Sequence, residues 1–140
     1  MKIVFDTNTL ISAVIARGKP NDLLLRAIAK EFILITSAKL LKELEEVVSR
    51  PKFKLSQYEV KKFIGAIRRT VEIVTVRAQF KVIKEDPDDD LILNTAVSGK
   101  ANYIVSGDTH LLKLKNFRGT KIVTANKMLE ILNKRSVQKV

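Results

Sequence analysis

The chain has 140 residues, of which 46% are hydrophobic, enough for one domain around a single buried core. It contains no cysteine, which excludes disulfide bonds and thiolate metal sites, and no apolar run reaches the roughly 18–20 residues that span a bilayer. The 26 Lys and Arg residues exceed the 15 Asp and Glu residues by a formal net charge of +11, which favours a polyanionic partner because basic side chains neutralise phosphates.

Short apolar runs predict the strands of a buried sheet. The runs cover residues 3–5, 32–36, 71–76, 103–106 and 121–124. Most of them are continuously apolar and do not alternate with polar residues. This pattern is typical of parallel strands that are covered by helices on both faces.

Helical patterns separate these runs and are bounded by capping residues and prolines. They cover about residues 9–16, 21–30, 38–50, 56–69, a stretch from 87 onward, and 125–134. Asn21 or Asp22 is the expected N-cap of the second helix. Ser37, Ser56 and Asp86 are the expected N-caps of the next three, with a proline directly after Asp86 at the first helical position.

The alternation of strands and helices predicts an α/β fold, a three-layer α/β/α sandwich with a mainly parallel sheet of about five strands. We expect a single domain over residues 1–134 and a frayed tail over 135–140, while the pattern of residues 77–85 is ambiguous. The apolar start of the chain is too short for a signal peptide, so we expect a cytoplasmic protein that does not enter a membrane.

Acidic residues follow the predicted strands where open parallel sheets bind their ligands. Asp6 ends the first strand and Asp108 follows the strand of residues 103–106, so both carboxylates face one crevice if these strands are neighbours. Asp90, in the first turn of a helix, and Glu43, on the third helix, could reach the same crevice. Such an oxygen-only set suits Mg²⁺ or Mn²⁺.

Each of these acids also has a structural explanation. Asp6 and Asp108 fit helix caps or turns about as well as they fit catalysis. The acids of residues 86–90 fit a helix N-terminus, but four acids in five positions repel one another, which favours a bound cation. Glu43 resembles many solvated helix glutamates, and the single histidine, His110, fits a surface position better than a zinc site.

Four segments taken together resemble the PIN-domain family. They are residues 4–8, 37–44, 86–91 and 103–108, and they occur in the family's order over nearly the whole chain. The sequence Arg-Pro-Lys-Phe at residues 50–53 is similar to the bacterial and archaeal VapC-like subgroup, the toxins of toxin–antitoxin pairs. No single segment is specific to this family, but the four segments in this order are.

The resemblance implies a parallel sheet between helices and a ribonuclease that depends on Mg²⁺ or Mn²⁺. It places the catalytic and metal-binding acids at Asp6, Glu43, Asp90 and Asp108. Supporting positions fall at Asn8 and Ser106, with Asp89 as the register alternative to Asp90 and Asp88 as a further one. It also implies single-stranded or structured RNA as substrate, an antitoxin that occupies the active-site groove, and a homodimer.

Other functions fit the acids less well. A haloacid-dehalogenase-type phosphatase would use Asp6 as nucleophile, but it needs a second acid two residues later, where this chain has Asn8. A phosphoacceptor receiver domain needs an acceptor Asp at the end of a later strand, and the strand ending at Thr36 offers none. A non-catalytic PIN scaffold that only binds RNA stays open, although the full set of acids favours an enzyme.

Overall fold

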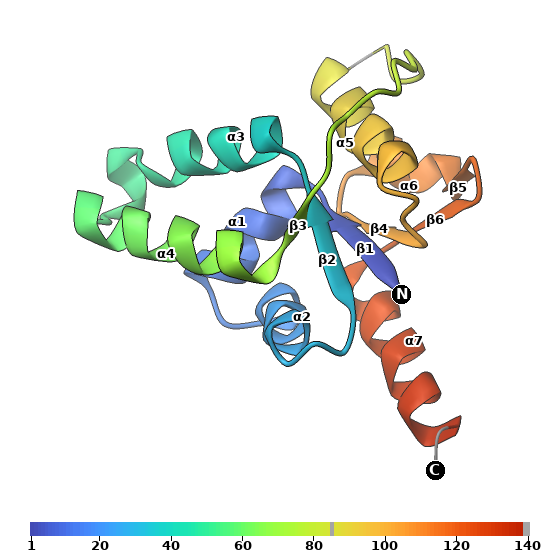
Figure 1. Cartoon of the computed structure of the whole chain (residues 1–140), viewed down its shortest axis with the longest axis horizontal. Coiled ribbons are helices and arrows are strands. Elements are labelled where there is room, and N and C mark those ends of the chain that lie inside the picture. The colour runs from blue at the N-terminus through green and yellow to red at the C-terminus, as the bar shows by residue number, and fades with distance from the viewer. Residues whose placement is uncertain (85, 139–140) are drawn as a thin grey trace.

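The computed structural model describes residues 1–84 and 86–138 (Figure 1). The strands are β1 (Lys2–Phe5), β2 (Ile33–Thr36), β3 (Glu72–Ile73), β4 (Tyr103–Val105), β5 (Asn116–Phe117) and β6 (Thr120–Val123). The α-helices are α1 (Thr7–Ile15), α2 (Lys19–Ile28), α3 (Ala38–Val48), α4 (Gln57–Thr70), α5 (Pro87–Ser98), α6 (Thr109–Leu114) and α7 (Ala125–Gln138). A short 3-10 helix, η1 (Pro51–Phe53), follows α3.

The six strands form one sheet in the order β3-β2-β1-β4-β6-β5, and every pair is parallel except β5 with β6. This confirms the predicted α/β class with a mostly parallel sheet. The sheet has one strand more than expected because β5, only two residues long, folds back on β6. The hairpin turns at Arg118 and Gly119, whose φ angles of 52° and 87° lie in the left-handed region.

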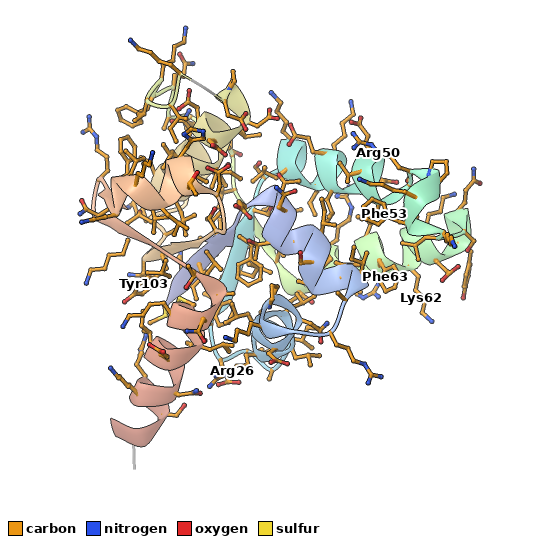
Figure 2. The ribbon with its side chains drawn as sticks, turned by 180° about the vertical axis from the view of Figure 1, so that it is seen from behind. Arg26, Arg50, Phe53, Lys62, Phe63 and Tyr103 are labelled. Carbon is orange, nitrogen blue, oxygen red and sulfur yellow. The ribbon has the colours of Figure 1, made fainter. Side chains whose placement is uncertain are left out.

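Helices cover both faces of the sheet, as alternate side chains of β1 show. Ile3 and Phe5 pack into one core with residues of α1, α2, α4 and α7, whereas Val4 packs into a second core with residues of α5 and α6. Figure 1 shows α5 and α6 on one side of the sheet and α1 and α2 on the other. Helix α3 contributes to both cores and carries the chain to η1, where Arg50 and Phe53 lie (Figure 2).

The helix boundaries follow the expected caps with three main differences. Helix α1 begins at Thr7, before its expected start at residue 9, with Asp6 as its N-cap. The side chains of Ser37, Ser56 and Asp86 accept hydrogen bonds from the first turns of α3, α4 and α5, as predicted. Helix α2 begins earlier than expected, at Lys19 after Gly18, and Pro20 lies in its first turn. Helix α7 continues through Gln138, past its expected end, so the expected frayed tail is helical up to there; residues 139–140 lie outside the described residues.

Residues 77–83, here called the strap, contain no helix or strand and lie along α5. Three polar side chains of α5, one helical turn apart, bind the strap's backbone. Ser98 accepts from the amides of residues 77 and 78, Asn94 pairs with both backbone groups of residue 80, and Asp90 accepts from the amides of residues 82 and 83. The strap therefore satisfies its backbone through side chains, which explains why it carries no strand or helix pattern.

No helix among residues 1–84 and 86–138 is both long enough and apolar enough to cross a bilayer.

Candidate metal centre

Strands β1 and β4 are neighbours at the point where the strand order reverses. Phe5 pairs with Val105 in register, so Asp6 and the loop that begins at Ser106 leave the sheet at the same carboxyl edge. Ligands of open α/β sheets bind at such a switch point because the connections on its two sides diverge and leave a crevice. The condition set by the sequence, that the first and fourth strands are neighbours, is therefore met.

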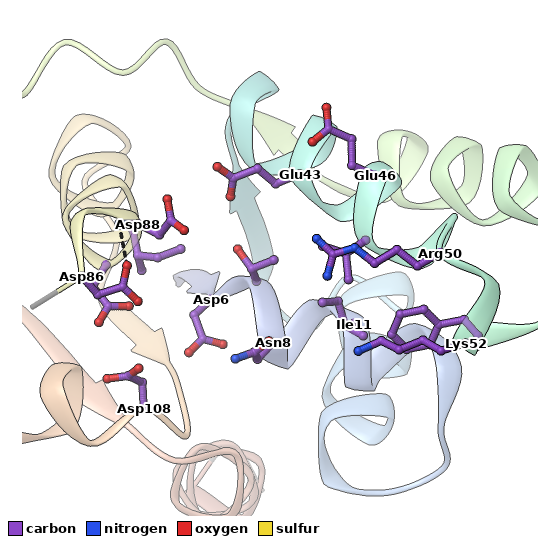
Figure 3. Close-up of a pocket in the computed structure, with 15 residues that line it drawn as sticks. Asp6, Asn8, Ile11, Glu43, Glu46, Arg50, Lys52, Asp86, Asp88 and Asp108 are labelled. Carbon is purple, nitrogen blue, oxygen red and sulfur yellow. Dashed lines mark hydrogen bonds between the residues drawn. The ribbon is translucent and has the colours of Figure 1, made fainter.

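A pocket of about 450 Å³ opens at this edge (Figure 3). Seven of the side chains that line it are acidic: Asp6, Glu43, Glu46, Asp86, Asp88, Asp89 and Asp108. Asn8 lines it as well, from the first turn of α1. The pocket thus gathers carboxylates from the ends of two strands and from two further helices.

Three of these aspartates cap the helices that begin at the pocket. Asp6 Oδ1 accepts from the Thr9 amide at the start of α1, at 2.8 Å. Asp86 Oδ1 accepts from the amide of residue 88 at 2.9 Å, and Asp108 Oδ1 accepts from the His110 amide at 2.7 Å. Capping and a role in the pocket are therefore compatible for Asp86 and Asp108, because Oδ1 of each holds its helix and Oδ2 remains for the pocket, whereas Oδ2 of Asp6 accepts a second hydrogen bond, from Ser106.

The helix ends also explain how so many acids share one place. Helices α1, α5 and α6 all begin at the pocket, and the partial positive charge at a helix N-terminus stabilises a nearby carboxylate. This stabilisation partly offsets the repulsion between the acids in the metal-free protein.

Ser106 joins the two strand ends. Its hydroxyl donates to Asp6 Oδ2 and accepts from the backbone amide of Asp108 at 2.9 Å. Ser106 is only 1% exposed and Asp6 only 5% exposed, so water does not compete for these bonds. The hydroxyl thereby fixes the orientation of the Asp6 carboxylate relative to the loop that carries Asp108.

Within the described part of the chain, Asp89 differs from the other acids of the pocket in combining burial with the lack of a hydrogen-bond donor for one carboxylate oxygen. It is 7% exposed, and its buried Oδ2 has no hydrogen-bond partner among the described residues. Burial raises the pKa of Asp89 from 3.8 to about 7, with further contributions from the charges of Asp108, Asp86 and Asp6. A buried carboxylate without a donor is costly unless it is protonated or binds a cation.

Asp86, Asp89 and Asp108 form the tightest group. Each offers a carboxylate oxygen, and these oxygens all lie within 4.8 Å of one another. Asp86 and Asp89 lie at the start of α5 and Asp108 caps α6, so the group forms only when these two helix starts are brought together. This spacing can hold one divalent cation.

Glu43 faces the group from across the pocket, on α3 (Figure 3). Burial raises the pKa of its carboxyl, and the nearby charge of Asp88 raises it further, while Lys39 lowers it. Glu43 is therefore electrostatically coupled to the acids of the pocket, although it is not in the tight group.

Asp90 takes a different position from the one expected. Its Oδ1 accepts the amides of Val82 and Ile83 at 3.0 and 2.9 Å, and its side chain does not line the pocket. Successive helix residues point about 100° apart, so Asp89 faces the pocket and Asp90 faces the strap. Asp89, the register alternative, therefore lies in the pocket in place of Asp90. Asp86 lies there as well, although the sequence analysis assigned it only as a helix cap.

The other sequence candidates are distributed as follows. Asn8 is exposed at the pocket edge, and Ser106 is buried beneath Asp6. Asp88 lines the pocket beside Glu43 but is exposed. His110 is exposed in the first turn of α6, and its charge lowers the pKa of Asp89 only as a minor contribution.

Comparison with known proteins agrees with this geometry. A family model for the PIN domain matches residues 2–110, which include every acid of the pocket. The chain therefore belongs to the PIN-domain family. No curated protein matches the chain significantly.

A solved structure has the same fold. A chain in the crystal structure of VapBC2 from Rickettsia felis, bound to a DNA fragment from their promoter, superposes with a TM-score of 0.59. The sequences are 19% identical, and the match covers 87% of this chain and 97% of that chain. At this identity the likeness establishes a shared fold.

Proposed function

We propose that this chain is a divalent-metal-dependent endoribonuclease that hydrolyses phosphodiester bonds of RNA. The observation that carries the proposal is the buried, unpartnered Oδ2 of Asp89 beside the carboxylates of Asp86 and Asp108. Membership of the PIN-domain family supports it, since metal-dependent nucleases are typical of that family.

The residues present fit a hard divalent cation such as Mg²⁺ or Mn²⁺. All donors are oxygens, and a cation would supply the missing partner of the buried Asp89 oxygen. Asp86, Asp89 and Asp108 would hold it, with Asp6 and Glu43 close enough to influence it electrostatically. When bound, the cation would neutralise the scissile phosphate and acidify a water for its hydrolysis.

The chain itself supplies orientation and attraction. Ser106 holds Asp6 in one rotamer, and the starts of α5 and α6 hold Asp86 and Asp108 through their backbone amides. Catalytic sites depend on such fixed geometry, because a ligand displaced by about 1 Å loses much of its effect. The net charge of +11 attracts RNA to the surface around the acidic pocket.

We further propose that the chain is a VapC-like toxin with an antitoxin partner. Its fold matches that of a chain of the VapBC2 assembly, and residues 50–53 resemble the same subgroup. An antitoxin would act by filling the pocket. A homodimer is expected on the same basis, and the exposed side chains of Leu25 and Ile28 on α2, 55% and 52% accessible, are candidates for its interface.

The phosphatase alternative is disfavoured by the position of Asp6. A hydrogen bond to a carboxylate oxygen lowers its nucleophilicity, and both oxygens of Asp6 accept one, Oδ1 from Thr9 and Oδ2 from Ser106. A non-catalytic RNA-binding scaffold would show the same basic surface, so only an activity measurement separates it from a nuclease.

The test is cleavage of end-labelled single-stranded RNA by the purified protein with Mg²⁺, with Mn²⁺ and with excess EDTA. We expect cleavage with either metal and none in the chelator. The Asp89→Asn variant serves as the matched control, because it preserves shape and removes one ligand. Cleavage that is equal in EDTA, or equal in the variant, would refute the metal-dependent site and point to a contaminating nuclease.

A further inference from the structure

The pocket extends beyond its acids to a second end with the opposite charge. Arg50, Lys52 and Phe53, in and next to η1, line this end of the same cavity. Figure 3 shows the charged groups of Arg50 and Lys52 pointing along the pocket toward the acids. The cavity therefore has an anionic half at the sheet edge and a cationic half at the end of α3.

Neither of these two cations forms an ion pair within the described residues. The ion pairs found within residues 1–84 and 86–138 join Lys2 to Glu72, Arg26 to Glu31 and Lys127 to Glu130, all outside the pocket. Arg50 follows Glu46 by one helical turn without pairing with it. Both cations are exposed, so their charges remain available to a ligand.

The backbone beneath the cations is rigid. Pro51 opens η1 with a fixed φ, and the amides of Phe53 and Lys54 bond back to residues 50 and 51. The Phe53 ring packs against the core, and the Lys52 ammonium lies 5.1 Å from its centroid, a cation–π contact. The ammonium is thus held at the pocket wall, which lowers the entropy lost when it binds an anion.

We infer that Arg50 and Lys52 form a phosphate subsite that binds the RNA backbone beside the scissile bond. The inference rests on the proposed nuclease function. It gives the path of the RNA strand across the protein, from the acid cluster toward η1. A polyanion is favoured as the ligand because one continuous strand can place one phosphate at the acid-bound cation and a neighbouring one at the two basic side chains. An isolated anion would gain only one of these contacts.

The decisive variants are Arg50→Gln, Lys52→Gln and their combination, with Lys62→Gln as the matched control. Lys62 is exposed on α4 and does not line the pocket (Figure 2). We expect KM for a short single-stranded RNA to rise about 10-fold for each pocket cation removed, with kcat little changed, since the lost contact acts on binding. Arg50→Lys should recover part of the loss, because it restores the charge but not the planar guanidinium.

A binding experiment tests the subsite separately from catalysis. RNA affinity is measured at several salt concentrations in the Asp89→Asn background, where cleavage is silenced. The slope of log affinity against log salt should flatten by about 0.7 for each pocket cation removed, and Lys62→Gln should change it less. Single RNA phosphates can then be replaced with neutral methylphosphonates. At one position, the loss of binding free energy should not add to the loss caused by Arg50→Gln, which identifies the phosphate that Arg50 contacts.

The outcomes separate the two hypotheses. A wild-type protein that cleaves no RNA with Mn²⁺ overturns the nuclease function, while the salt slope still decides whether the cations bind backbone phosphates. A protein that cleaves RNA with the same KM and the same salt slope in Lys62→Gln and in the Arg50→Gln, Lys52→Gln double variant overturns the subsite. That result would favour an acidic protein partner as the ligand of the two cations.

Discussion

Asp89 and Asp90 are neighbours on α5 with opposite environments, so their substitutions should have opposite effects. Asp89 places an unpartnered oxygen in the acid cluster, whereas Asp90 binds two amides of the strap. Asp89→Asn should leave the metal-free protein equally stable or more stable, because a buried charge and its repulsions disappear. Asp90→Ala should destabilise it, because the partly buried amide of Ile83 loses its acceptor.

The magnitudes follow from these contacts. Loss of the acceptor for two amides in Asp90→Ala should cost about 1–3 kcal/mol, or roughly 2–4 °C in Tm for each kcal/mol. Asp90→Asn should cost less, since its amide oxygen can still accept. At 100 times its Kd, Mn²⁺ should stabilise the wild type by about 2.7 kcal/mol; a variant that binds about 100-fold more weakly should gain only about 0.4 kcal/mol.

The assay is thermal unfolding of the wild type, Asp89→Asn, Asp90→Asn and Asp90→Ala, each with EDTA and with saturating Mn²⁺, together with RNA cleavage. We expect the Mn²⁺-induced rise in Tm to be lost in Asp89→Asn and kept in Asp90→Asn. If Asp89→Asn keeps the full rise and Asp90→Asn loses it, then Asp90 is the ligand, and the assignment based on the orientation of α5 is refuted.

Four further outcomes are expected. The metal-free protein should become less stable as pH rises from about 4 to 7, because the folded state binds the Asp89 proton more tightly (pKa about 7 against 3.8) than the unfolded chain does; a Tm profile equally steep in Asp89→Asn would contradict this. Ser106→Ala should cost about 1–3 kcal/mol in denaturant unfolding, since Asp6 loses a donor and the Asp108 amide loses an acceptor; an unchanged midpoint would show that the bridge is not stabilising. RNA affinity should fall steeply between low and physiological salt, as the net charge of +11 requires, and a flat dependence would exclude backbone neutralisation as its source. Light scattering should report a dimer that Leu25→Glu dissociates, whereas a wild-type monomer at high micromolar concentration would refute the expected assembly.

The sequence was sufficient to predict a mainly parallel sheet and to place Asp6 and Asp108 after two of its strands, although it left open whether these strands are neighbours. The apolar runs at 3–5 and 103–106 mark buried parallel strands, and such strands place their following residues at one edge. Helix α6 and strand β5 were not predicted, because elements of six and two residues are too short for a periodic pattern.

The details of the site depended on tertiary contacts. Asp89 and Asp90 are chemically identical in the sequence, and which one faces the pocket is decided by the strap on the other side of α5. The strap itself has no local signal, since side chains of α5 satisfy its backbone. Asp86 was assigned only as a cap because the sequence does not reveal that its second oxygen lies near Asp108.

The hydrogen bond between Ser106 and Asp6 joins residues that are 100 positions apart in the chain. A fragment of the chain that ends before Ser106 lacks both this bond and Asp108, the third member of the tight acid group. The acid group is therefore completed only by residues from the last third of the chain, after most of the chain has been synthesised.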